Sequence, residues 1–192
     1  MKRLSLLLIM LLSIISACNQ VKPLKDLPSD SIFLLNSDWQ NQKGETIKLK
    51  DLRGKTLVVV MIYTTCKASC PILVADMKKI EQQIKPDNLK KTSMVLVSID
   101  PETDTPERLL QFAKERNMDA DHWILLRGNE ASTQEFANVL SMKYKKISPI
   151  DFSHSNIISI FNPDGELISQ EEGVGINVEK VANKVNEVIK KS

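Results

Sequence analysis

Two cysteines separated by three residues are the part of this chain whose chemistry is most informative. Cys66 and Cys70 lie in the run YTTCKASCP at residues 63–71, and the third cysteine, Cys18, lies far from them. Isolated paired thiols usually perform chemistry, either thiol–disulfide exchange or the binding of a soft metal ion. A purely structural disulfide is a poor alternative, because closing so small a loop stabilises a fold by only about 2 kcal/mol.

The residues around the cysteines place them between a strand and a helix. Residues 56–63 form an apolar, β-branched run that is typical of a strand buried on both faces. Pro71 suits the first turn of the helix that follows. Free backbone N–H groups and the helix dipole lower the pKa of a thiol at such a position, and Lys67 adds a positive charge. We therefore expect reactive thiolates, the form that attacks disulfides and binds metals.

The order of the predicted elements indicates the fold class. Further strands are expected at residues 94–99 and 123–126, helices from about 106, at about 130–140 and at 178–189, and a hairpin at 152–161 and 166–170. This order, βα, βα, βα, ββ, α, predicts an α/β thioredoxin-like three-layer sandwich, and residues 32–52 add a short N-terminal β-hairpin. The cysteines then lie at the carboxyl end of a central strand, the edge where open α/β sheets bind ligands.

One histidine falls where a thioredoxin-like fold faces its thiols. His154 occupies the place at which thioredoxin-type oxidoreductases carry a cis-proline, and those proteins have two residues between their cysteines instead of three. With Cys66 and Cys70, His154 could complete a Cys₂His site. Such donors suit copper, because thiolate favours Cu(I) and imidazole tolerates Cu(II). A structural zinc site is a weaker alternative because it normally needs four protein ligands.

The N-terminus predicts export and a lipid anchor. Residues 1–17 combine a basic start with an apolar run too short to span a bilayer, and small residues precede Cys18. This segment resembles a bacterial lipoprotein signal, which predicts that Cys18 carries the lipid. Residues 18–31 are then a polar, flexible tether, and residues 32–192 are the domain. The protein is expected in the cell envelope, attached to a bacterial membrane with its domain facing the periplasm or the exterior.

The charge of the mature chain argues against nucleic acid as a partner. Loss of Lys2 and Arg3 with the signal peptide reduces the 26 basic residues to 24, which equals the number of acidic residues. A neutral domain lacks the electrostatic basis for binding phosphate backbones.

Three segments together resemble the Sco/SenC family, thioredoxin-fold proteins that assist the copper A centre of cytochrome c oxidase. They are YTTCKASCP, the run DPETDTPERL at residues 100–109, and His154 ahead of NPDGE at 162–166. The resemblance implies copper ligation by Cys66, Cys70 and His154, and a copper-binding oxidase subunit as partner. Members usually have glycine and proline where this chain has Ile62 and Lys67.

Three functions are compatible with these residues. The first is a membrane-tethered copper chaperone for the oxidase. The second is a thiol–disulfide oxidoreductase that keeps the copper-binding cysteines of the oxidase or other exported thiols reduced and is itself reduced by a thiol reductant. In it Cys66 attacks, Cys70 resolves and His154 tunes proton transfer. The third is a binding module that senses copper or redox state for a signalling partner.

Three further polar residues are weaker candidates. His122 precedes a predicted strand, where a histidine that binds no metal is the simpler interpretation. Asp100 and Asp104 could orient ligands, although capping and turn formation explain them equally well.

Overall fold

The computed structural model describes residue 23, residues 26–149 and residues 151–192. The predicted signal peptide, Cys18 and most of the predicted tether lie outside these residues. Within them, no helix combines the length and apolarity that a membrane span requires. Ser31, at the end of the predicted tether, is buried, and its hydroxyl donates a hydrogen bond of 2.5 Å to the Asp164 carbonyl oxygen.

A seven-stranded sheet in the order β2-β1-β5-β4-β3-β8-β9 forms the centre of the domain. Its inner strands β3, β4 and β5 are parallel, whereas β8 runs antiparallel to β3. All seven residues of β3 and of β4 are buried, as their apolar runs predict. The strands are β1 (Asp38–Asn41), β2 (Thr46–Lys48), β3 (Thr56–Ile62), β4 (Thr92–Ser98), β5 (Trp123–Arg127), β8 (Ile157–Phe161) and β9 (Leu167–Glu172).

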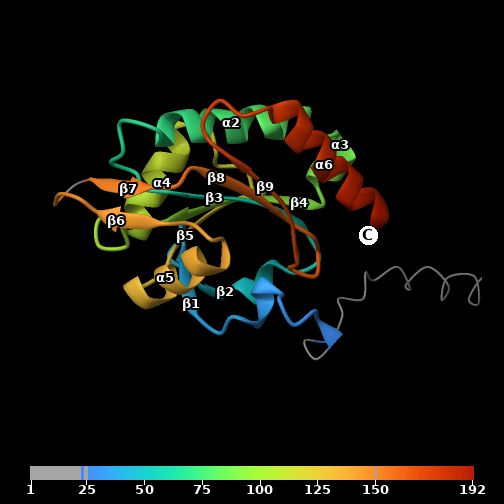
Figure 1. Ribbon diagram of the computed structural model, residues 1–192, viewed down its shortest axis with the longest axis horizontal. Helices are drawn as coiled ribbons and strands as arrows, with labels where there is room; N and C mark the ends of the chain where they lie inside the picture. Colours follow the sequence, from blue (N-terminus) through green and yellow to red (C-terminus); the bar gives the residue numbers. More distant parts are fainter. Residues whose placement is uncertain (1–22, 24–25, 150) are drawn as a thin grey trace, which may run out of the picture.

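Helices cover both faces of this sheet and give it the three layers expected of a thioredoxin-like fold. Figure 1 shows α2, α4 and α6 on one side of the sheet and α5 on the other. Buried residues recur at helical spacing, for example Leu73, Met77 and Ile80 in α2. The helices are α2 (Cys70–Gln83), α3 (Pro86–Leu89), α4 (Pro106–Glu115), α5 (Glu130–Val139) and α6 (Val178–Lys191), with 3-10 helices η2 (Ile32–Leu34) and η3 (Leu49–Leu52).

The prediction of one continuous strand over residues 152–161 is wrong, because the structure divides this segment into two strands in different sheets. The second of them, β8, forms the expected hairpin with β9. β7 (Phe152–His154) pairs only with β6 (Tyr144–Lys146), and β8 begins at Ile157 in the central sheet. The break follows from local bonding: the Ser155 N–H donates to the Lys143 carbonyl oxygen, whereas Asn156 accepts from the Gly173 N–H beside β9. The separate two-stranded sheet projects at the same end of the molecule as the start of α2 (Figure 1).

Candidate metal centre

The loop from β3 to α2 brings the two cysteines together. Tyr63 follows the last residue of β3, and Cys70 is the first residue of α2 with Pro71 directly after it. Both thiols are unbridged and buried, with exposed fractions of 7% for Cys66 and 2% for Cys70. The predicted placement at a helix entrance is therefore confirmed.

His154 reaches the thiols from a different part of the chain. The ligand atoms of Cys66, Cys70 and His154 all lie within 4.8 Å of one another, and His154 Nε2 is 3.6 Å from Cys70 Sγ. The histidine is the last residue of β7, so its approach depends on the two-stranded sheet. The fold thus unites the three predicted ligands in one half-buried site.

A backbone carbonyl fixes which nitrogen of His154 faces the sulfur atoms. Nδ1 lies 3.0 Å from the Ser155 carbonyl oxygen, which can only accept a hydrogen bond. In the neutral ring Nδ1 therefore carries the proton, and Nε2 presents its lone pair toward Cys70 and the Ser69 hydroxyl. This is the tautomer that a metal ligand needs, with its other nitrogen held by a carbonyl group.

The two thiols differ in acidity. Burial tends to raise the pKa of Cys66, but hydrogen bonds from the Cys70 thiol and from the backbone of Cys70 and Ala68 outweigh it and lower the pKa. Burial raises the pKa of Cys70 far above its usual range, more than the Tyr63 backbone hydrogen bond lowers it. The expected lowering is thus correct for Cys66 and wrong for Cys70, whose position is too deep for the helix terminus to compensate.

Asp104 anchors the loop that carries Cys66. Its carboxylate accepts hydrogen bonds from the Thr64 N–H at 3.1 Å, the Thr64 hydroxyl at 2.5 Å and the Ser98 hydroxyl at 2.6 Å. Arg108 Nε donates to the same Thr64 hydroxyl at 3.1 Å. Asp104 is fully buried, so it holds the chain two residues before Cys66 to the end of β4. Asp104 was a weak candidate from the sequence, but no sequence pattern indicated that Thr64 would be its partner.

The other two candidates lie outside the three-donor group. His122 Nε2 is 2.5 Å from the Glu81 carboxylate, which also accepts from the Trp123 indole at 2.9 Å, so His122 joins α2 to the start of β5. Asp100 is buried, and its backbone carbonyl oxygen accepts from the N–H groups of Thr103 and Asp104 in the turn before α4.

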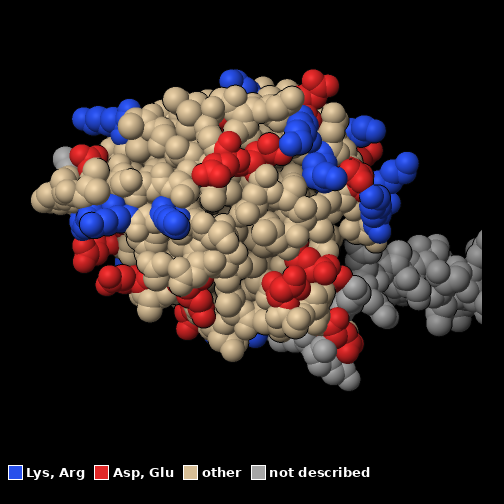
Figure 2. Space-filling model, viewed as in Figure 1, with Lys and Arg blue, Asp and Glu red and all other residues tan. Residues whose placement is uncertain are grey.

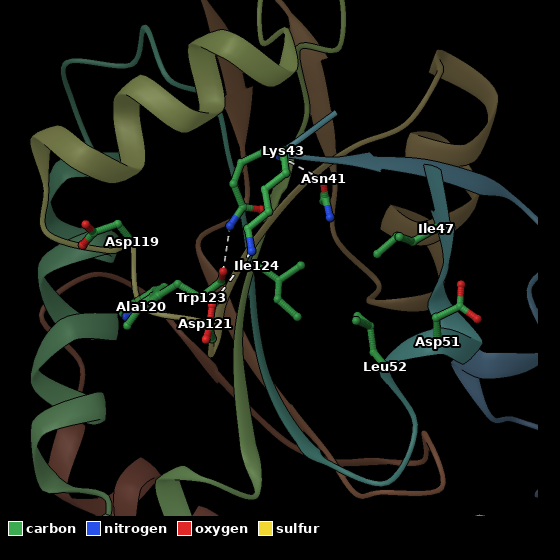
Figure 3. Close-up of a pocket in the computed structure, with 11 residues that line it drawn as sticks. Asn41, Lys43, Ile47, Asp51, Leu52, Asp119, Ala120, Asp121, Trp123 and Ile124 are labelled. Carbon is green, nitrogen blue, oxygen red and sulfur yellow. Dashed lines mark hydrogen bonds and ion pairs between the residues drawn. The ribbon is translucent and has the colours of Figure 1, made fainter. Parts of the chain in front are cut away.

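A cavity of about 230 Å³ lies away from this centre, between the β1–β2 hairpin and the residues that lead into β5. Figure 3 shows Asp119 and Asp121 on one side of the cavity and Ile47 and Leu52 on the other, with Lys43 reaching toward Asp121. Lys43 Nζ and an Asp121 carboxylate oxygen are 3.9 Å apart. None of the three predicted ligands lines this cavity.

The face shown in Figure 2 carries basic and acidic side chains side by side. Basic groups gather near β6 and near the end of α6, and acidic groups lie between and below them. Neither sign forms a continuous patch over this face.

The arrangement provides two sulfur donors and one imidazole, a donor set suited to a soft or borderline transition-metal ion. Three protein donors leave one coordination position for a ligand from another molecule. The site therefore fits exchange of a metal ion better than permanent structural binding.

Comparisons with known proteins agree with this architecture. The profile of the SCO1/SenC family matches residues 33–190. The SCO1 protein homolog of Bacillus subtilis is 28% identical over 139 residues, which are 71% of this chain and 72% of that protein.

Two solved structures share the fold. A SCO1/SenC family lipoprotein from Bacillus anthracis superposes with a TM-score of 0.73 and 24% identity, over 82% of this chain and 96% of that one. Arabidopsis thaliana ScoI with copper bound gives a TM-score of 0.71 and 20% identity, over 81% and 97% of the two chains. Because the family profile spans most of the sequence, the chain belongs to the SCO1/SenC family.

Proposed function

We propose that this protein binds copper through Cys66, Cys70 and His154 and delivers it to the copper A centre of cytochrome c oxidase. The observation that carries the proposal is the convergence of the three donor atoms within 4.8 Å. They come from the loop after β3 and from the hairpin formed by β6 and β7, which are far apart in sequence. The copper-bound Arabidopsis relative and membership of the SCO1/SenC family support copper as the cargo.

The donor set explains how one site could both hold and release copper. Two thiolates suit Cu(I), and the imidazole lets the site accommodate Cu(II) as well. The open position lets a ligand of the recipient approach before the first donors leave. Since copper needs reduced thiols, a thiol reductant must keep Cys66 and Cys70 from forming a disulfide.

Replacing His154 by alanine tests the site. The reduced wild-type domain is expected to bind one copper ion, and His154→Ala is expected to weaken Cu(II) binding by at least about a hundredfold, because even groups that only orient a ligand cost 10–100-fold. Metal analysis and competition titration measure this. The matched control is His122→Ala, since the chain has two histidines and His122 contacts Glu81 instead of the thiols.

Equal copper affinity in wild type and His154→Ala would contradict the proposed ligand set. Delivery has its own readout. Cells that carry His154→Ala should lose the copper A absorption of the oxidase, whereas cells that carry His122→Ala should keep it. Normal copper A in the His154→Ala cells would argue against delivery while leaving copper binding intact.

We also propose that a lipid on Cys18 attaches the protein to the bacterial envelope. The small residues before Cys18 and the lipoprotein from Bacillus anthracis support this anchor. A Cys18→Ser variant should move from the membrane fraction to the soluble fraction, because acyl chains contribute about 0.8 kcal/mol per buried methylene. Cell fractionation measures the shift, with Cys66→Ser as the control that should stay with the membrane. Unchanged membrane retention of Cys18→Ser would exclude the lipid anchor.

Thiol–disulfide exchange is a second candidate, favoured by the inequality of the two thiols. Cys66 has a lowered pKa and Cys70 a raised one, which suits attack by the first sulfur and resolution by the second. A Cys70→Ser variant, which cannot resolve a mixed disulfide, separates this function from copper delivery.

A further inference from the structure

We infer that Tyr63 is a positioning residue that holds the hairpin carrying His154 against the cysteine loop. This inference deepens the proposed copper site and rests on it. The Tyr63 hydroxyl then contributes to the Cu(II) affinity of the site, because Cu(II) is the oxidation state that depends most on the imidazole.

The aromatic ring of Tyr63 packs against the β6–β7 hairpin, next to His154. Tyr63 is buried directly after β3, and its ring centroid lies 5.2 Å from that of Phe152 and 6.0 Å from that of His154. The Tyr63 and His154 rings meet edge to face, with an interplanar angle of 82°. The tyrosine thus forms one wall of the histidine position.

The hydroxyl of Tyr63 joins the hairpin to the cysteine loop. It accepts a hydrogen bond from the Phe152 N–H at 3.3 Å, and it lies 3.4 Å from the Asp151 carboxylate, to which it can donate. Tyr63 itself begins the cysteine loop, and its carbonyl oxygen accepts a hydrogen bond from the Cys66 N–H at 3.3 Å. Tyr63 therefore contacts both segments that supply ligands, the hairpin through its hydroxyl and the cysteine loop through its backbone.

The hairpin needs such a support because β6 and β7 have no partner in the central sheet. They form a two-stranded sheet of their own, and an isolated hairpin is marginally stable in water. Tyr63 is attached to β3, all of whose residues are buried, so it gives the hairpin a rigid surface. A ligand held in place before the metal arrives loses less conformational entropy on binding.

The second tyrosine of the chain provides a matched control. Tyr144 stands opposite His154 in the β6–β7 pairing, and its ring centroid is 6.4 Å from that of Phe152. Among the hydrogen bonds of the described residues, none involves the Tyr144 hydroxyl. Tyr144→Phe therefore removes the same hydroxyl group from a residue of the hairpin itself, without removing a hydrogen bond between the hairpin and the cysteine loop.

The experiment compares Tyr63→Phe with Tyr144→Phe. In the metal-free, reduced protein, Tyr63→Phe should speed hydrogen exchange of the Phe152 amide by about tenfold, since its acceptor is lost. Cu(II) affinity should fall by about tenfold with a shift in the thiolate-to-copper absorption band, whereas Cu(I) affinity should change by less than about twofold. Tyr144→Phe should leave all three measurements unchanged.

Identical behaviour of the two variants in amide exchange and in Cu(II) affinity would overturn the role of Tyr63. Equal losses of Cu(I) and Cu(II) affinity in Tyr63→Phe would also overturn it, because they would indicate general damage to the thiol loop. A wild-type protein that binds no copper would refute the proposed function instead. In that case unchanged exchange of the Phe152 amide in Tyr63→Phe would separately refute the positioning role.

Discussion

A Cys70→Ser variant of the reduced domain is expected to bind no detectable copper, compared with one ion per wild-type chain. Cys70 Sγ is the sulfur that lies 3.6 Å from His154 Nε2, so its loss removes one donor and the contact that links thiol to imidazole. A serine hydroxyl in the same buried position cannot replace it, because copper in such a site selects soft thiolate donors. Metal analysis after removal of loosely bound copper measures the stoichiometry.

The same variant also tests the competing function. Cys66 remains in Cys70→Ser together with the backbone hydrogen bonds from residue 70 and Ala68 that lower its pKa, so a thiol-exchange protein should accumulate a mixed disulfide between Cys66 and its partner. Cys66→Ser is the matched control, because the sulfur that remains there is the more deeply buried one and has a raised pKa. It should lose copper equally but trap far less partner. Full copper stoichiometry in a variant that lacks both thiols would refute the ligand set.

The thiol half of the site could be predicted from the sequence because its signals are local. An uninterrupted apolar run precedes the cysteines, and Pro71 follows Cys70 at a position suited to a helix start. Strand, loop and helix then follow in the order that the structure shows, from Thr56 to Gln83. The start of α4 is equally local: Thr105 caps it by accepting a hydrogen bond from the Arg108 N–H.

The β6–β7 hairpin that carries His154 could not be predicted from local sequence signals. β6 and β7 have three residues each, and Lys145 and Lys146 give β6 little of the hydrophobic pattern that identifies a strand. β7 contacts Tyr63, whose hydroxyl accepts from the Phe152 N–H across 89 positions of sequence, and no local pattern indicates such a contact. The raised pKa of Cys70 was missed for a related reason: burial depth depends on the assembled fold, whereas a helix terminus is visible in the sequence.

Replacing Asp104 by alanine is expected to lower the free energy of unfolding by about 3 kcal/mol or more. The fully buried carboxylate accepts from Thr64 and Ser98, and its removal leaves those donors without a partner at a cost of about 1–3 kcal/mol for each buried group. Urea denaturation of the metal-free, reduced domain measures the change. Glu102→Ala is the matched control from the same loop, because its ion pair with Lys146 is largely exposed and contributes about 0–1 kcal/mol.

The loss of unfolding free energy in Asp104→Ala should depend on pH, because the pKa of Asp104 is shifted in the folded protein. Burial raises that pKa, and the hydrogen bonds from Ser98 and Thr64 offset burial only in part. A folded-state pKa above the unfolded one means that the carboxyl group stabilises the fold most below its unfolded pKa, and less as the pH rises through the folded value. The difference between wild type and Asp104→Ala should therefore shrink as the pH rises above the unfolded pKa of aspartate, about 3.9. A difference that grows over this range would contradict the raised pKa.

The same substitution should weaken copper binding without touching a ligand, because Asp104 fixes Thr64 two residues before Cys66. A more mobile loop must become ordered when the metal binds, and the conformational entropy lost in that step makes binding less favourable. We expect Asp104→Ala to reduce Cu(I) and Cu(II) affinity together, since both oxidation states use Cys66. Tyr63→Phe should affect mainly Cu(II), which relies on His154, so the two variants probe opposite halves of one site. If Asp104→Ala lost stability but kept full affinity for both ions, its carboxylate would support the fold alone, and the cysteine loop would hold its shape without it.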